Sequence, residues 1–239
     1  MKTEKSNLPL IEKGSGKPLI FLHGYMCSKE IFASQIEFFS KTHKVIAYDL
    51  YGFGKNLPMQ RAYSLDDYVQ EFFEIASNCG EKVCVVAHSF GCRVILKALS
   101  KKQGNIIEKA LLCGVAGLKP KFSFKKTFKR RVYKILKPFA PKAWLEKMFF
   151  SSDYNLASGY MKQTFKIVTS EYLDEYLKQI QIPLFLIFGE RDDQTPPAIA
   201  KKIKNQVANC GVHIMQECSH FCFLEKPNEF NYVAKEFLL

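Results

Sequence analysis

Short, almost uninterrupted apolar runs alternate along this chain with longer amphipathic stretches, and this alternation constrains the fold more than any other feature. The runs are PLIFLHG, HKVIAYDL, KVCVVAHS, IEKALLCGV, PLFLIFGE and GVHIMQE. Such continuous hydrophobicity indicates strands buried on both faces, as in a parallel sheet covered by helices. Helical patterns fill the gaps, at residues 28–40, 64–78, 90–102, 196–205 and 227–237. The order of these elements predicts an α/β fold with a mostly parallel central sheet flanked by helices.

The alternation breaks between about Gly114 and Ile182, where the chain keeps helical patterning but offers no convincing strand. We interpret residues 115–182 as a helical insertion, and residues 1–114 together with 183–239 as the core of a single domain. At 239 residues, 47% hydrophobic and 24% charged, the chain is long enough and apolar enough to bury a sizeable core.

Positive charge is concentrated in this insertion. The segment from Lys119 to Lys147 holds eleven basic residues and the single acid Glu146, which accounts for +10 of the net charge of +12. One interpretation is a solvated face whose long side chains cover apolar surface. The other is a surface that attracts acyl carrier protein, coenzyme A esters or an anionic membrane. We do not expect nucleic acid as a partner, because no nucleic-acid motif accompanies the charge.

The cysteines and the hydropathy profile indicate a cytoplasmic protein. Three of the eight cysteines lie in or beside apolar, core-like segments, which favours reduced, buried thiols: Cys84, Cys92 and Cys113. No apolar run approaches the roughly 18 residues that a membrane crossing requires, and the opening MKTEKSNLPL does not resemble a secretory signal. Cys218, His220 and Cys222 alternate, but zinc sites usually use another spacing and a fourth ligand, so we expect no metal.

The strongest chemical signal is VCVVAHSFGCRVILKAL, in which a buried strand runs through Ser89 directly into a helix. A nucleophilic serine at such a turn needs small neighbours, because the strand and helix backbones crowd there, and Ala87 and Gly91 meet that need. The turn would push the Ser89 hydroxyl out of the sheet, and the helix would aim its N-terminal N–H groups at the same place. Ser89 is therefore the candidate nucleophile.

With this motif the chain resembles the α/β-hydrolase superfamily over residues 19–239. LHGY at residues 22–25 is similar to the loop that supplies half of that family's oxyanion hole. The resemblance therefore implies that the backbone N–H groups of Tyr25 and Phe90 are the two oxyanion donors. It also implies that the insertion is a helical lid placed after the sixth strand.

Two other loops of the resemblance have structural interpretations. His23, beside the expected oxyanion donor, is expected to brace its loop rather than to titrate. YDLYGFGKN at residues 48–56 is similar to the family's D-x-x-G-x-G turn. It does not predict a dinucleotide site, because Leu57 stands where the third glycine of that fingerprint would be.

The resemblance places the catalytic acid after a late strand. FLIFGERDDQTPP at residues 185–197 offers Asp192 at the family's position, with Asp193 as the close alternative and Glu190 still open. Some members of the family take the acid one strand earlier, but the turn there, GVAGLKP, contains no carboxylate.

The catalytic base comes last in this family. CSHFCFLEKPNEF at residues 218–230 resembles the family's final loop and leads His220 into the C-terminal helix. The order Ser89, Asp192, His220 along the chain is the order of the α/β-hydrolase triad. We therefore expect Ser89 as nucleophile, Asp192 as acid and His220 as base.

These residues predict a serine hydrolase, most simply a carboxylesterase, that cleaves an ester or thioester through an acyl-enzyme without any cofactor. One alternative is an esterase or thioesterase for acyl carrier protein or coenzyme A substrates, steered by the basic insertion. Another is a ligand-binding module that keeps the fold without catalysis. The sequence does not identify the acyl group or the leaving group.

Overall fold

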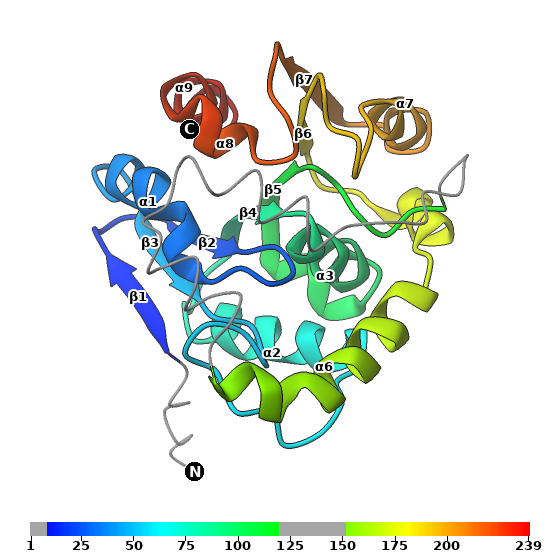
Figure 1. The fold of residues 1–239 in the computed structure, drawn as a ribbon. Helices are drawn as coiled ribbons and strands as arrows, with labels where there is room; N and C mark the ends of the chain where they lie inside the picture. The colour runs from blue at the N-terminus through cyan, green and yellow to red at the C-terminus, as the bar shows by residue number, and fades with distance from the viewer. Residues whose placement is uncertain (1–8, 120–151) are drawn as a thin grey trace.

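The computed structural model describes residues 9–119 and 152–239, with the backbone alone for residues 152–158. In this part of the chain the strands form one sheet in the order β1-β3-β2-β4-β5-β6-β7 (Figure 1). The strands are β1 (Leu10–Lys13), β2 (Pro18–Leu22), β3 (Lys44–Tyr48), β4 (Val83–His88), β5 (Ile107–Cys113), β6 (Leu184–Gly189) and β7 (Cys210–Met215). β1 runs antiparallel to β3, and the other neighbouring pairs are parallel. The expected mostly parallel sheet is confirmed.

Helices connect the strands and cover both faces of the sheet. The α-helices are α1 (Ala33–Phe39), α2 (Leu65–Ser77), α3 (Phe90–Leu99), α6 (Ser152–Ser170), α7 (Ala198–Lys204), α8 (Cys222–Glu225) and α9 (Pro227–Leu238). The 3-10 helices are η1 (Lys29–Phe32), η2 (Lys102–Ile106) and η3 (Asp174–Gln179). At the start of α2, the Ser64 hydroxyl accepts from Asp67 N while the Asp67 carboxylate accepts from Ser64 N, a reciprocal cap that fixes where the helix begins.

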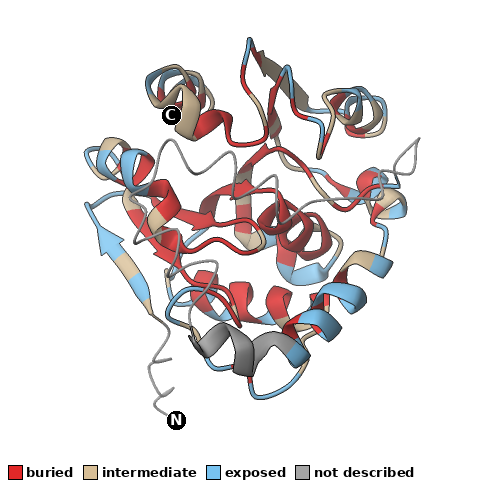
Figure 2. Ribbon diagram, viewed as in Figure 1, coloured by how far each residue is buried: buried red, intermediate tan, exposed pale blue. Residues whose placement is uncertain are grey.

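The core is divided by the sheet into two apolar layers. Side chains alternate along a strand, so in β2 Ile20 and Leu22 belong to one layer while Leu19 and Phe21 belong to the other. The first layer is covered by α2, α3 and α7, and the second by α1, α8 and α9 (Figure 1). The central strands are buried along their length (Figure 2). Burial on both faces explains why their sequences read as continuous apolar runs.

Two features of the fold differ from the sequence expectation. β1 was not expected, because its four residues are largely exposed at the antiparallel edge of the sheet and carry no apolar run. The insertion was expected after a sixth strand, but among the described residues it follows the fifth, β5. Residues 120–151 of that insertion lie outside the described residues, and its described remainder contains α6 and η3.

The eight cysteines are free thiols, and six of them are buried. Over residues 9–119 and 152–239, no helix combines the length and the apolar character that crossing a bilayer would take.

Candidate active site

Ser89 occupies the turn between β4 and α3, with a φ of 50° and a ψ of −103°. A positive φ is strained for a residue with a side chain, so the surroundings must hold this turn in place. Ser89 N donates a hydrogen bond to the carbonyl of Cys113 on β5 at 2.9 Å. Gly91 is required because a Cβ atom there would lie 2.5 Å from the carbonyl oxygen of Leu22 on β2. The serine is thus fixed by contacts with both strands that flank β4.

His220 lies in the loop between β7 and α8 and faces Asp192, which follows β6. His220 Nδ1 lies 2.8 Å from Asp192 Oδ2, and the two residues are only 2% and 3% exposed. Because the carboxylate can only accept, Nδ1 carries a hydrogen, and in the neutral imidazole Nε2 is then the nitrogen with the lone pair. Nε2 has no hydrogen-bond partner among the described residues. This is the protonation pattern that a general base needs.

Asp192 is held as an oriented anion. Its Oδ1 accepts from Gln194 N and Thr195 N, both at 2.9 Å, and its Oδ2 accepts from the Thr195 hydroxyl at 2.8 Å. Burial by itself would raise the pKa of Asp192, but the interactions with His220 and Thr195 outweigh it and hold the pKa below its ordinary value. Asp193, the close alternative, is exposed.

Thr195 was missed in the sequence, although it lies 3.2 Å from His220 Nδ1 through its hydroxyl. One sequence signal could have found it. An Asp side chain commonly accepts hydrogen bonds from the backbone N–H groups two and three residues later, which after Asp192 are those of Gln194 and Thr195.

Ser89 and His220 both lie against the C-terminal end of β5. Ser89 N binds the carbonyl of Cys113, and the next residue, Gly114, is so near His220 that a Cβ atom on it would lie 3.0 Å from His220 Cε1. In the described residues no hydrogen bond joins Ser89 to His220 Nε2. Such bonds are often long before a substrate binds.

The loop after β2 passes directly beside Ser89. A Cβ atom on Gly24 would lie 3.4 Å from Ser89 Cβ, which places the backbone of the expected oxyanion loop against Ser89. The Tyr25 ring packs edge-to-face on the Phe90 ring at 6.0 Å between centroids. Phe90 begins α3, and the first N–H groups of a helix have no partner within that helix. The two expected donors therefore come from adjoining segments at the serine.

His23 braces this loop, as expected. Its Nε2 accepts from Leu50 N at 3.1 Å, so its Nδ1 is the donor to the carbonyl of Gly24 at 2.8 Å. Burial lowers the pKa of His23, which keeps the ring neutral for these two bonds. The neighbouring turn is likewise structural, because the Asp49 carboxylate accepts from Lys29 N at 2.8 Å and Lys55 N at 2.9 Å.

Aromatic side chains line the approach to the loop, and α6 packs against them. The Tyr25 ring lies 5.1 Å from the Phe53 ring and 4.8 Å from the Phe165 ring of α6. The Tyr25 hydroxyl donates to the carbonyl of Met161 at 3.2 Å, and Thr164 Oγ1 accepts from Tyr63 N at 2.9 Å. The described end of the insertion is therefore docked on the core beside the expected oxyanion loop.

Arg93 ties the C-terminal end of α6 to α3. Its Nη1 donates to the carbonyls of Val168 at 2.6 Å and Glu171 at 2.5 Å, which satisfies carbonyl groups that a helix end leaves without partners. Burial lowers the pKa of Arg93 to about 10, so the guanidinium remains charged near neutral pH. Lys97, one turn further along α3, binds the Glu171 carboxylate at 2.7 Å.

The basic segment from Lys119 to Lys147 lies outside the described residues except for Lys119. Lys119 N donates to the Asp174 carboxylate at 3.0 Å, at the start of η3. The expectation of an anion-attracting lid therefore stays a prediction.

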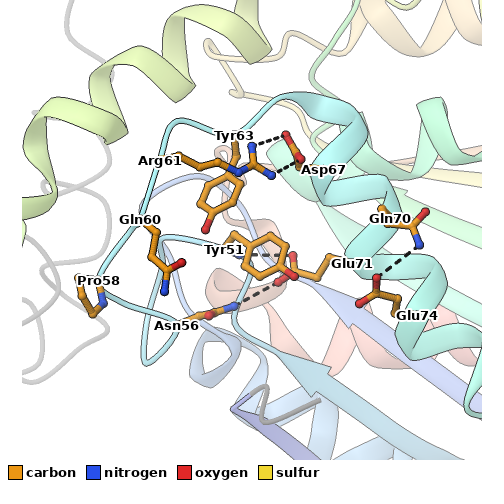
Figure 3. A pocket seen from close by; sticks show the side chains of 10 residues that line it. All are labelled: Tyr51, Asn56, Pro58, Gln60, Arg61, Tyr63, Asp67, Gln70, Glu71 and Glu74. Atoms are coloured by element: carbon orange, nitrogen blue, oxygen red, sulfur yellow. Dashed lines mark hydrogen bonds and ion pairs between the residues drawn. The ribbon is translucent and has the colours of Figure 1, made fainter. Parts of the chain in front are cut away.

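A pocket of about 460 Å³ lies away from these residues, between α2 and the loop that follows β3 (Figure 3). Neither Ser89 nor Asp192 nor His220 lines it. Burial raises the pKa of Glu71 in its wall to about 9, so this carboxyl is neutral at pH 7. Its oxygens accept from Asn56 Nδ2 at 3.1 Å and Tyr51 N at 3.3 Å, and these two bonds hold the turn at residues 48–56 against α2. We interpret this acid as structural.

The chain is similar to known hydrolases over nearly its whole length. A family model described as the alpha/beta hydrolase family matches residues 19–231. The 2-hydroxy-6-oxo-6-(2'-aminophenyl)hexa-2,4-dienoic acid hydrolase of Metapseudomonas resinovorans is 22% identical over 250 residues, which cover 95% of this chain and 86% of that protein. The pimeloyl-[acyl-carrier protein] methyl ester esterase of Legionella pneumophila (strain Lens) is 26% identical over 245 residues, covering 97% of this chain and 99% of that protein.

Among solved structures, a serine hydrolase involved in carbazole degradation superposes with a TM-score of 0.82 at 22% identity. The match covers 96% of this chain and 93% of that one. At this level of identity the likeness establishes the fold.

Proposed function

The chain belongs to the alpha/beta hydrolase family, and on this basis we propose that it is a serine hydrolase that cleaves a carboxylic ester or thioester with Ser89, His220 and Asp192. The observation that carries the proposal is the 2.8 Å contact between His220 Nδ1 and Asp192 Oδ2, which leaves His220 Nε2 without a partner among the described residues. A buried imidazole oriented in this way by an anion is suited to take a proton from a nearby hydroxyl.

In the proposed reaction, Ser89 Oγ attacks the carbonyl carbon as its proton passes to His220 Nε2. Negative charge develops on the carbonyl oxygen, where the N–H groups of Tyr25 and Phe90 are the proposed donors, each contributing roughly 2.7–4 kcal/mol. His220 then gives its proton to the leaving alcohol or thiol, and an acyl-Ser89 ester remains. In the second half His220 takes a proton from a water molecule that attacks the acyl carbon, and it returns this proton to Ser89 Oγ as the acid is released. Asp192 stabilises the imidazolium in both halves.

A carboxylesterase is the simplest form of this activity. The aromatic rings of Tyr25, Phe53 and Phe165 beside the expected oxyanion loop favour an apolar acyl group. The named relatives are named for different substrates, so they do not identify the bond that this protein cleaves. The proposal of an ester bond rests on the candidate site.

A second candidate function is an esterase or thioesterase whose substrate is carried by acyl carrier protein or coenzyme A. The segment from Lys119 to Lys147 carries a net charge of +10, and acidic carriers are steered by such a surface. The pimeloyl-[acyl-carrier protein] methyl ester esterase of Legionella pneumophila, which matches this chain end to end, is named for such a substrate.

The free thiols support a reducing compartment, and we propose the cytoplasm.

The proposal is tested by treating the purified protein with a fluorophosphonate probe and locating the adduct by mass spectrometry, with Ser89→Ala and His220→Ala beside the wild type. We expect labelling at Ser89 alone, and none in either variant. If correctly folded wild-type protein is not labelled at Ser89, the hydrolase proposal is wrong and a ligand-binding module takes its place.

A labelled protein is then assayed on matched pairs of esters: a methyl ester of a short acyl chain, free and attached to acyl carrier protein. The carrier candidate expects a higher kcat/KM for the attached ester and a fall in that advantage with added salt, because salt screens the steering charge. Equal kcat/KM values at low salt would reject it and leave the simple carboxylesterase.

A further inference from the structure

His88 is buried at the point where three parts of the candidate site meet. It is the last residue of β4, immediately before Ser89, and is 1% exposed. Its Nε2 lies 3.0 Å from the backbone carbonyl oxygen of His220. On the other side of the ring, a Cβ atom on Gly24 would lie 2.8 Å from His88 Nδ1. One imidazole therefore touches the nucleophile's strand, the loop of the base and the expected oxyanion loop.

The contact with His220 fixes the state of the His88 ring. A carbonyl oxygen can only accept, so His88 Nε2 must carry the hydrogen and donate it. Burial, followed by the neighbouring His220, lowers the pKa of His88 well below its ordinary value, so the ring stays neutral with Nδ1 unprotonated. Nδ1 is buried and has no hydrogen-bond partner among the described residues. The ring therefore makes a single directed bond, and that bond ends on His220.

Aromatic rings pack around the His88 side chain. The Phe221 and Phe223 rings each lie 4.9 Å from the His88 ring, and the His220 ring lies at 4.7 Å. A buried donor among such rings loses its whole hydrogen-bond energy if its acceptor moves. The position of the His220 main chain is thus coupled to the strand that ends in Ser89.

We propose that His88 is a positioning residue: its Nε2–H, donated to the His220 carbonyl, sets the distance between His220 and Ser89. This inference rests on the proposed serine-hydrolase function. His88 does not act on the substrate; it acts through His220, whose imidazole is contacted separately by Asp192 and Thr195. Reacting groups displaced by about 1 Å can lose on the order of a hundredfold in rate.

The test compares two substitutions at His88. In His88→Leu the donor is lost while an apolar side chain fills the pocket, whereas in His88→Gln the amide NH₂ can reach the His220 carbonyl. We expect His88→Leu to lower kcat on an ester about 10- to 100-fold with KM within about twofold, and His88→Gln to restore most of the loss. His43→Leu is the matched control, because His43 is another buried histidine, 2% exposed, whose ring contacts Thr42 and Phe39 instead.

A second measurement does not depend on catalysis. Hydrogen exchange of the loop at residues 218–222 should be faster in His88→Leu than in the wild type or in His88→Gln, because the loop has lost its tie to β4. If His88→Leu keeps wild-type kcat, or if both variants lose equally, the hydrogen bond is not what positions His220. If fluorophosphonate does not label the wild type, the hydrolase proposal fails, and unchanged exchange of this loop in His88→Leu then rejects the positioning role separately.

Discussion

Gly114 packs so closely against His220 that a Cβ atom added to it would lie 3.0 Å from Cε1 and 3.1 Å from Nδ1 of the imidazole. Gly114 also has a φ of 58°, which glycine adopts without strain. We expect Gly114→Ala to push the His220 ring out of line with Asp192 and to lower kcat at least tenfold, with KM nearly unchanged. Steady-state kinetics on the best ester substrate measures this.

The control for that variant is Gly80→Ala. Gly80 has a φ of 73°, and a Cβ atom there would meet nothing within 4 Å. Both alanine variants carry the backbone strain, which costs roughly 1–2 kcal/mol, but only the alanine at position 114 contacts His220. An equal loss of kcat in the two variants would mean that strain, and not the contact, is responsible.

Asp192→Asn should lower kcat by roughly 10³- to 10⁴-fold, because an amide neither holds the His220 tautomer nor stabilises the imidazolium. Asp193→Asn, one residue along, should stay within about twofold of the wild type, since Asp193 is exposed and Asp192 makes the bond to His220. The ratio of kcat/KM values in the two variants decides which aspartate is the acid. A larger loss in the second variant would exchange their roles.

Glu71→Gln should change the pH dependence of stability. The pKa of Glu71 is raised by burial to about 9, against about 4.3 in the unfolded chain. Between these values the folded state keeps a proton that the unfolded chain has released, so the folded state loses stability as the pH rises. The Glu71→Gln variant does not ionise, and we expect its Tm relative to wild type to move upward by several degrees from pH 5 to pH 8.

Thermal melts at unit pH intervals measure that shift. The substitution can also change Tm by an amount that does not depend on pH, and comparing the Tm difference across the pH range removes this contribution. A constant Tm difference between Glu71→Gln and the wild type across the range would show that Glu71 is ionised in the folded protein.

Arg93→Met should loosen α6. The substitution keeps an apolar stem but removes the bonds to the carbonyls of Val168 and Glu171, each of a strength of about 1.5–3 kcal/mol for a charged donor. Hydrogen exchange over residues 160–172 should become faster, and the urea midpoint should fall. Arg191→Met removes an exposed arginine paired with Glu217 and should change neither. Unaltered exchange in Arg93→Met would show that α6 is held by its other contacts alone.

Much of the fold could be predicted because the strands are buried on both faces. The run at residues 83–87 is continuously apolar since the strand it belongs to, β4, lies in the middle of the sheet. β1 was not predicted because an exposed edge strand needs no apolar run, and its pairing with β3 depends on residues far along the chain. The helix expected over residues 28–40 is a 3-10 turn followed by α1, a distinction that apolar periodicity does not make.

Part of the candidate site could likewise be predicted from local sequence, and part depends on the tertiary structure. Ser89 was evident from local sequence, because the strand, the small neighbours and the helix lie within one short segment. The preference for Asp192 over Asp193 came from the family resemblance. Which side chain faces His220 depends on the turn after β6, and the bonds from Gln194 N and Thr195 N that fix it are visible only in the structure. The His88 bond to His220 spans 132 residues and has no local signature.

From β4 to β7 the strands lie in the sheet in the order in which they are synthesised, and this bears on how the protein is made. Ser89 and the strand that supports it, β5, are complete by residue 113, whereas the proposed acid and base follow β6 and β7. A ribosome-bound chain that has emerged only as far as β6 therefore carries its nucleophile without a base. On the proposed mechanism, nascent and prematurely terminated chains are chemically silent, and activity begins only when the last strand pairs with the one before it.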